Sequence, residues 1–333
     1  MLRENAGVID ISNFANYIIK GRGAYDWLNK LVANHVPTVI GRSCLTPLIS
    51  VLGGVAGDFT ITKVADDEYM MIGSGMAERY HQRYFNMVEL PDDTTLDIAT
   101  NRIAGFNVAG PKSRELLQYL TNADLTNEQF RFMRSRNIDV AGVTCLAIRV
   151  SFTGDLGWEL HCAEKDQVQL YTALLDAAEK CGGGAVGGRA LSSLRIEKGY
   201  GSWGREYSQE YWPQEVGLDG LIKLDKDFLH KDAYLKIKEN TPRTVLSIFE
   251  IDVSHDADAS GGEPIFTTDG KPAGFVTSGA YGYSVEKSLA IGSVNPAVVS
   301  AGDTVEVFIL GKPHKARMLE TAPFDPDGQR LRH

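Results

Sequence analysis

The sequence has little cysteine and no pattern that binds zinc. Its 333 residues include four cysteines that form no CxxC pair, and no two histidines have the spacing of zinc ligands. Neither a disulfide framework nor a metal site is therefore predicted. We expect four reduced thiols in or near hydrophobic cores, which is typical of a reducing compartment such as the cytoplasm or a mitochondrial matrix. These thiols belong to Cys44, Cys145, Cys162 and Cys181.

Long hydrophobic runs and an excess of basic charge are also missing. The uncharged stretch near 43–57 is shorter than the about 20 residues of a membrane span and is interrupted by Pro47, Gly53 and Gly54. No basic stretch followed by an apolar core opens the chain, so no secretory signal is expected. Lys and Arg number 34 against 43 Asp and Glu, a net charge of −9, which argues against nucleic-acid binding.

What is present is the composition of a globular protein, 43% apolar and 23% charged, over a length that suggests about two domains. Hydrophobic periodicity predicts strands over 14–20, 45–72, 96–99, 103–109, 143–151 and 158–162. It predicts helices over 24–32, 76–88, 112–120, 168–179 and 190–198. We expect the strands at 96–99 and 103–109 to pair with each other.

The pattern changes near residue 244. Short alternating strands separated by Gly, Pro and Asp follow, which is typical of a small antiparallel barrel or sandwich packed against a larger α+β part. The charged segment 236–243 marks the boundary. We therefore predict an α+β fold with an α+β region over 1–240, in two subdomains, and a C-terminal antiparallel β-barrel domain over 241–333.

Several motifs have ordinary structural explanations. Three glycines at 182, 184 and 187 match GxGxxG, but a predicted helix precedes them where a dinucleotide site needs a strand, so we interpret them as a loop between helices. The charged residues of the helix that ends before Gly199 are expected to form surface ion pairs: Arg195, Glu197 and Lys198. Three histidines without a visible catalytic partner are expected to be structural or exposed: His161, His230 and His255.

Two acids stand out as candidates for a functional role. Asp58 follows a glycine-rich turn at the start of an apolar strand, where it either caps the turn, the commoner case, or faces a cleft. Glu159 lies in a strand whose alternation places Trp158 and Leu160 on one face and Glu159 with His161 on the other. It lies either on a solvated strand face, the commoner case, or in a site where its carboxylate accepts two hydrogen bonds from a planar heterocycle.

The motifs around these acids resemble the glycine-cleavage T-protein (aminomethyltransferase) family. The resemblance includes LRIEKGY at 194–200, WGRE at 203–206, PQEVGL at 213–218 and KLDKDF at 223–228. It extends from GVIDIS at 7–12 to GFVTSG at 274–279 and PFDPDGQRLR at 323–332, and thus over nearly the whole chain. It is greatest to the folate-binding C-terminal half of dimethylglycine and sarcosine dehydrogenases, because Gly73-Ser74-Gly75 replaces an Asn-containing loop and Leu191 replaces an arginine.

The resemblance implies a T-protein-like fold with tetrahydrofolate in a central channel. Asp58 matches the family's catalytic carboxylate near the reactive one-carbon unit, and Glu159 matches the residue that binds the N–H edge of the pterin. The remaining implied cofactor-binding positions, of which one has Phe in place of the family's Tyr, are Thr60, Ile72, Gly73, Phe152 and Trp203. Trp158 and Trp203 are expected to flank the ligand.

The implied activity is one-carbon transfer from an N-methylene amine to tetrahydrofolate, giving 5,10-methylenetetrahydrofolate. The small-molecule amine donor is the implied partner, together with a flavin-dependent amine dehydrogenase, since this chain itself resembles no FAD domain. Two alternatives stay open: a folate-dependent O- or S-demethylase, and a non-catalytic folate-binding module that serves such a dehydrogenase. Family members usually have several tens of residues before the segment at 7–12, so a shortened member is expected.

Overall fold

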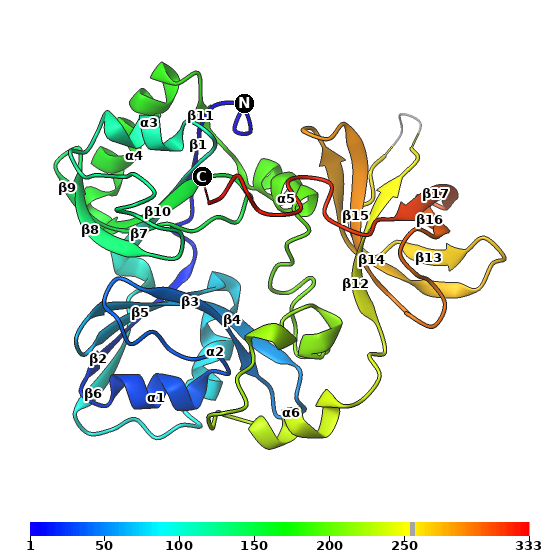
Figure 1. Cartoon of the computed structure of the whole chain (residues 1–333), viewed down its shortest axis with the longest axis horizontal. Coiled ribbons are helices and arrows are strands. Elements are labelled where there is room, and N and C mark those ends of the chain that lie inside the picture. The colour runs from blue at the N-terminus through cyan, green and yellow to red at the C-terminus, as the bar shows by residue number, and fades with distance from the viewer. Residues whose placement is uncertain (254–256, 333) are drawn as a thin grey trace.

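The computed structural model describes residues 1–253 and 257–332, which form two mostly antiparallel sheets with their helices and a separate barrel (Figure 1). His255 lies outside the described residues. The predicted α+β fold with a C-terminal antiparallel barrel is confirmed. None of the helices in the described part of the chain has the length and apolar character that a membrane span requires.

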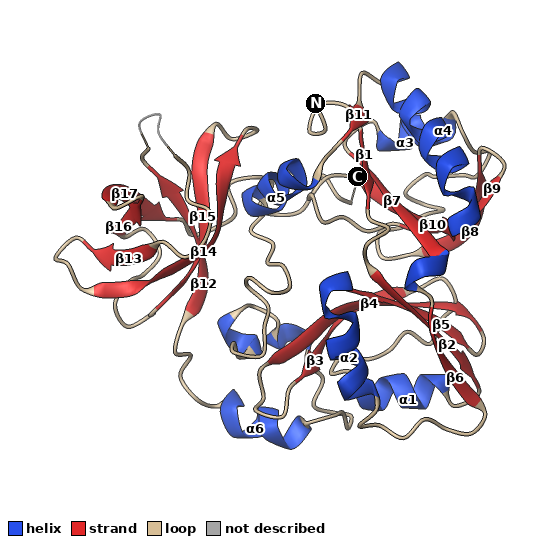
Figure 2. Ribbon diagram, turned by 180° about the vertical axis from the view of Figure 1, so that it is seen from behind, coloured by secondary structure: helices blue, strands red, loops and turns tan. Residues whose placement is uncertain are grey.

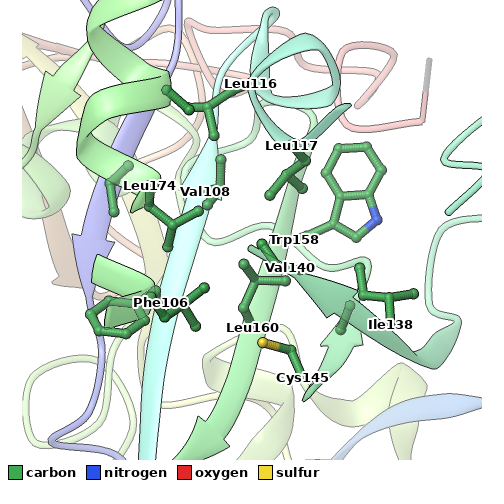
Figure 3. Close-up of a cluster of buried hydrophobic side chains, with 14 of the residues drawn as sticks. Phe106, Val108, Leu116, Leu117, Ile138, Val140, Cys145, Trp158, Leu160 and Leu174 are labelled. Atoms are coloured by element: carbon green, nitrogen blue, oxygen red, sulfur yellow. The ribbon is translucent and has the colours of Figure 1, made fainter. Parts of the chain in front are cut away.

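The six-stranded sheet holds the first core. Its order is β11 (Gly184–Ala185), β1 (Gly7–Asp10), β7 (Ile103–Ala109), β10 (Gly157–Ala163), β9 (Val143–Ile148) and β8 (Ser135–Val140). Trp158 and Leu160 of β10 pack on this sheet's outer face with residues of α3 (Ser113–Gln118) and α4 (Gln167–Lys180) (Figure 3). The alternation predicted for β10 is thus confirmed.

The five-stranded sheet is built in the same way. Its order is β3 (Ser43–Ile49), β4 (Val55–Ala65), β5 (Glu68–Gly73), β2 (Ala15–Gly21) and β6 (Thr94–Ile98). The helices α1 (Ala24–Leu31) and α2 (Glu78–Phe85) cover one face through a core that contains Trp27, Phe59 and Phe85. Each sheet therefore has one face free of its own helices.

The two helix-free faces meet. Met70 and Ile72 of β5 form one buried cluster with Ile148 of β9, so the inner face of the five-stranded sheet packs on the inner face of the six-stranded sheet. The two sheets lie one above the other in Figure 1, and both are seen from behind in Figure 2. Side chains on these inner faces lie between two sheets rather than in solvent.

Two local expectations are wrong. The strands near 96–99 and 103–109 do not pair, because β6 lies beside β2 in one sheet and β7 lies between β1 and β10 in the other. The chain changes sheets at a short 3₁₀ turn, Thr100–Arg102. The glycine-rich segment 182–187 is more than a loop, since Gly184 and Ala185 form β11 and pair in parallel with β1. Both outcomes depend on long-range pairing that local periodicity does not encode.

The C-terminal strands close into a barrel in the order β12 (Val245–Ile251), β15 (Lys287–Val294), β14 (Pro272–Gly282), β13 (Pro264–Thr267), β16 (Thr304–Ile309) and β17 (Lys312–Met318). A segment containing α6 (Lys231–Lys238) leads into it. Helix α5 (Gly188–Glu197) lies between barrel and sheets (Figure 1). The cysteines are free, as predicted, and three of them are buried: Cys145, Cys162 and Cys181.

The charged residues of α5 and its end are buried, so the expected surface ion pairs are wrong. Glu197, 1% exposed, accepts hydrogen bonds from Arg3 at 2.7 and 3.0 Å. Arg3 also pairs with Asp155 at 2.6 Å, which in turn pairs with Arg330 at 2.7 Å. The network ties the N-terminus, the centre and the C-terminal tail together, which places both chain ends near α5 (Figure 1). Lys198 is likewise buried and pairs with Asp325 at 3.3 Å.

Candidate functional site

Asp58 lies inside β4, so its expected role as a turn cap is wrong. It pairs with Pro47 of β3 in the strand ladder, and Thr60 two residues later pairs with Leu45 on one side and Ile72 on the other. Because side chains two residues apart share a face of a strand, Asp58 lies on the same face as Thr60. Ile72 belongs to the cluster between the sheets, so this is the inner face.

Asp58 is half-buried on this face. Burial raises the pKa of Asp58 to about 6, partly offset by a hydrogen bond from its own backbone N–H. Burial raises the pKa of Tyr207 strongly, and the negative charge of Asp58 raises it further. Tyr207 packs in one cluster with Val55, the first residue of β4. A carboxyl with this pKa is mostly ionised at neutral pH and can stabilise a positive charge beside it.

Gly73 ends β5, immediately after Ile72, and pairs with Ala15. A Cβ at Gly73 would lie 2.7 Å from the ring of Phe59, so this position requires glycine. The neighbouring Ile72 is 5% exposed and packs toward Ile148. The end of β5 therefore lies between the helix-covered core on the Gly73 side and the cluster between the sheets on the Ile72 side.

Glu159 projects from the inner face of the six-stranded sheet and is only 9% exposed, so the expectation of a solvated strand face is wrong. Its strand neighbours are Asn107 of β7 and Ile148 of β9. The imidazole Nε2 of His161 lies 3.5 Å from a carboxylate oxygen of Glu159. His161 is buried, as expected of a structural histidine, yet it lies beside the candidate binding acid.

Several buried polar atoms near Glu159 form no hydrogen bond with any described residue. Asn107 Nδ2 and both ring nitrogens of His161 are buried without a hydrogen bond, and so is Asn16 Oδ1 of β2. Asn16 pairs with Ile72 in the strand ladder and thus lies on the opposing inner face. Buried donors and acceptors without partners are costly, and they mark a place where a polar ligand or water completes the hydrogen bonds.

Asp58 and Glu159 come from different sheets but lie on facing surfaces. Thr60 pairs with Ile72, Ile72 shares a cluster with Ile148, and Ile148 pairs with Glu159. This chain of contacts crosses from one sheet to the other. It connects Glu159, on the inner face of the six-stranded sheet, with the face of β4 that carries Asp58.

The two tryptophans that were expected to flank the ligand lie in different surroundings. Trp158 is fully buried in the outer core of the six-stranded sheet, on the face opposite Glu159, so the expectation that it flanks a ligand is wrong (Figure 3). Trp203 packs near the first residue of β4, with its ring centroid 5.7 Å from Tyr80 and 5.6 Å from His81. Only Trp203 therefore lies next to the strand of Asp58.

Phe152 precedes β10 and is half-buried. Its ring stacks on Tyr200 with the centroids 6.3 Å apart and an angle of 21° between the planes. Phe152 lies in the segment that precedes the strand of Glu159, and Tyr200 lies in the segment that precedes Trp203. The pair forms a flat aromatic surface of the kind that packs against planar rings.

Neither a metal site among the described residues nor the cavity beside the barrel involves the predicted site. Among the described residues, no group of three or more His, Cys, Asp or Glu could hold a metal ion. A cavity of about 740 Å³ opens beside the barrel, lined by residues such as Glu250, Tyr281 and Lys287, and it contains none of the predicted site residues. It holds an internal Glu250–Lys287 ion pair at 2.8 Å, so we assign no site to it.

Three side chains near the candidate site were not singled out from the sequence for the role suggested here: Asn107, His161 and Tyr207. Strand alternation pointed to His161, since it shares a face with Glu159. The other two depend on which strand lies beside Glu159 and which loop folds over β4.

Comparisons with known proteins show the family and the fold of the chain. Residues 1–226 match the GCVT N-terminal domain and residues 245–325 match the glycine cleavage T-protein C-terminal barrel domain. The fold resembles the crystal structure of the glycine cleavage system aminomethyltransferase T of Bartonella henselae, with a TM-score of 0.87, 21% identity and coverage of 100% of this chain and 89% of that one.

Similar curated proteins are of two kinds. Mitochondrial dimethylglycine dehydrogenase of Mus musculus is 33% identical over 95% of this chain, which spans 37% of that protein's length. Aminomethyltransferase of Anoxybacillus flavithermus is 31% identical over 97% of this chain, which spans 88% of that protein. The fold is therefore that of the T-proteins. The chain belongs to the glycine cleavage T-protein family, as its motifs predicted.

Proposed function

We propose that the protein is a tetrahydrofolate-dependent transferase of the aminomethyltransferase type, which takes a one-carbon unit from an N-methylene amine and forms 5,10-methylenetetrahydrofolate. The observation that carries the proposal is the buried Glu159, beside which Asn107 and His161 have polar atoms without a hydrogen bond to any described residue. These groups fit the flat, hydrogen-bonding pterin ring, and the facing strand supplies a second acid, Asp58. Family membership supports the same activity.

Glu159 binds the ring in this proposal. An ionised carboxylate accepts two parallel hydrogen bonds from adjacent N–H groups, and such charge-assisted bonds are strong where water is excluded. Thr60, the backbone of Ile72 and Gly73, Phe152 and Trp203 line the space along the bound molecule. Tetrahydrofolate supplies the amine nitrogens that accept the one-carbon unit.

Asp58 provides the electrostatic part of the reaction. Its half-buried carboxylate stabilises the positive charge that develops on an amine nitrogen next to it. Holding the charge at a fixed distance requires no solvent rearrangement during the reaction. The same carboxylate accepts the proton that such a nitrogen releases.

The binding role of Glu159 is tested by calorimetry. Glu159→Ala is expected to weaken the binding of tetrahydrofolate by about 2–5 kcal/mol, because the N–H edge of the ring loses its acceptor. Glu164→Ala, an exposed acid just beyond the same strand, is the matched control and is expected to bind like the parent. Equal affinity of the Glu159 variant and the parent would exclude the assignment.

Asp58 is tested by turnover. Asp58→Ala is expected to lower kcat of methylene transfer with a much smaller loss of tetrahydrofolate binding, since the residue acts on developing charge. In the parent, kcat is expected to fall as the pH drops below about 6, where Asp58 becomes protonated. An unchanged kcat in the variant removes Asp58 from the chemistry.

A second candidate function follows from the length comparison. The chain matches only 37% of the mouse dimethylglycine dehydrogenase, so it corresponds to one part of that longer protein. We propose as the alternative that it is a folate-binding module which serves a flavin-dependent amine dehydrogenase. Methylene transfer by the purified chain from a chemically supplied iminium donor favours the enzyme. Transfer only after addition of such a dehydrogenase favours the module.

A third possibility, O- or S-demethylation, yields a different product. Mass spectrometry distinguishes 5-methyltetrahydrofolate from 5,10-methylenetetrahydrofolate. Tetrahydrofolate should in each case quench the emission of Trp203, which lies beside β4, and leave the deeply buried Trp158 unaffected.

A further inference from the structure

The barrel strand β14 contains a β-bulge that faces the N-terminal region. Val276 pairs with Gly292 and Ser278 pairs with Ile291, so Thr277 is an extra residue between two ladder pairs. A bulge interrupts the alternation of side chains along a strand and redirects them. The consecutive hydroxyls of Thr277 and Ser278 both donate to one oxygen, Glu206 Oε1, at 2.7 and 2.6 Å.

The other carboxylate oxygen of Glu206 is also fully used. Glu206 is 0% exposed, and its Oε2 accepts hydrogen bonds from Arg195 of α5 at 2.9 Å and from the backbone N–H of Ser202 at 2.9 Å. Arg195 in turn donates to Ser278 at 2.6 Å. Glu206 therefore connects the turn at 202–206 by hydrogen bonds to α5 and to the barrel.

The loop that Glu206 holds carries aromatic residues of the candidate site. Glu206 lies between Trp203, which packs on Tyr80 and His81, and Tyr207, whose pKa responds to the charge of Asp58. A few residues later, the carbonyl of Tyr211 accepts the backbone N–H of Val55, the first residue of β4. A continuous path of contacts thus runs from the barrel through this loop to the strand of Asp58.

We propose that Thr277 and Ser278 are positioning residues: acting through Glu206, they hold Trp203 and Tyr207 against β4 and so set the surroundings of Asp58. The C-terminal barrel is then part of the working site although it contributes no group that touches the reacting atoms. The effect on turnover rests on the proposed function. The effect on the loop does not.

These hydroxyls are not needed merely to attach the barrel. Ser193 of α5 donates to the carbonyl of Tyr281 at 2.6 Å, and Glu197 accepts the backbone N–H of Ser284 at 2.9 Å. Arg205 donates to the carbonyl of Thr277 at 3.2 Å, which a side-chain substitution at 277 does not remove. The barrel therefore keeps several contacts with the rest of the chain when the two hydroxyls are lost.

The test uses the full chain and two hydroxyl deletions, Thr277→Val and Ser278→Ala, singly and together. Thr277→Ser keeps the hydroxyl and serves as the rescue variant. Thr267→Val is the matched control, because it removes a barrel hydroxyl whose partners, Asp269 and Lys271, lie in the turn between β13 and β14. Thermal unfolding shows whether each variant is folded. If the double variant is not folded, the single variant Thr277→Val is measured in its place.

Two measurements are made on each variant. Steady-state kinetics give kcat and KM of methylene transfer, and acrylamide quenching reports the accessibility of Trp203, isolated by subtracting the emission of the same variant with Trp203→Phe. The double variant is expected to lose about tenfold or more in kcat, because small displacements around a reacting centre are costly, with a smaller change in KM. Trp203 is expected to become several-fold more quenchable, and Thr277→Ser to behave like the parent.

The outcomes are separable. A folded deletion variant with the kcat and the Trp203 quenching of the parent overturns the proposal, and so does one in which Trp203 loosens while kcat is unchanged. A loss of kcat that Thr277→Ser shares, or that Thr267→Val reproduces, also overturns it. If the parent itself transfers no one-carbon unit, the proposed function fails, while the quenching of Trp203 still decides whether the hydroxyls hold the loop.

Discussion

Two groups of buried polar side chains in this molecule differ in how fully they are paired. Around α5, Arg3 pairs with Asp155 and Glu197, and Arg195 and Thr277 donate to Glu206, so these buried groups are satisfied by short ion pairs and hydrogen bonds. Between the two sheets, buried nitrogens of Asn107 and His161 and a buried oxygen of Asn16 form no hydrogen bond with the described residues. Full pairing is what a structural junction requires, whereas unpaired polar atoms on facing surfaces are what a ligand site leaves before it is filled.

The largest expected effect separates the two groups by stability. Glu197→Ala leaves Arg3 buried with one partner fewer and is expected to lower the free energy of unfolding by about 3–5 kcal/mol. Glu159→Ala removes a carboxylate with only a 3.5 Å contact to His161 and is expected to cost less than about 1 kcal/mol. Urea unfolding at neutral pH measures both. Equal losses would show that the contrast between the groups is wrong.

An intermediate effect concerns Asp58 and pH. Its pKa in the folded protein, about 6, lies above the ordinary value of 3.8, so the folded state binds more protons between these values. Stability therefore falls as the pH rises from about 4 to 6, and the full cost remains above that window. Asp58→Asn, which stays neutral, is expected to gain about 1–3 kcal/mol relative to the parent at pH 8 and little at pH 4.

The control for that prediction is Asp66→Asn in the exposed turn between β4 and β5. Unfolding free energies at pH 4 and pH 8 are compared for the three proteins. A gain that is the same at both pH values, or that Asp66→Asn shares, contradicts the assigned cause, which is burial of the carboxyl.

The smallest expected effect tests whether the buried atoms without hydrogen bonds belong to a ligand site. Asn107→Leu removes a buried donor without a partner and is expected to raise the unfolding free energy by about 1 kcal/mol while weakening tetrahydrofolate binding. Asn137→Leu on the exposed side of β8 is the matched control and should change neither quantity. If Asn107→Leu destabilises the protein and leaves binding intact, Asn107 belongs with the structural group.

Local patterns in the sequence predicted most of the helices, several strands and the face on which Trp158, Glu159, Leu160 and His161 of β10 lie. Alternation separated Trp158 and Leu160 from Glu159 and His161, and the short Gly-bounded strands after residue 244 indicated the barrel. The family followed from motifs spread along the chain. The boundary near residue 240 and the roles of Asp58, Glu159 and the other site residues stay predictions.

Only the tertiary structure decided which other elements and side chains those strand faces contact. It assigned β6 and β7 to different sheets, buried Glu197 against Arg3, and turned the inner faces of two sheets toward each other. It also placed the bulge at Thr277 against Glu206. The physical reason is range: periodicity records how a residue relates to neighbours a few positions away, whereas sheet partners and buried ion pairs join residues that are up to hundreds of positions apart.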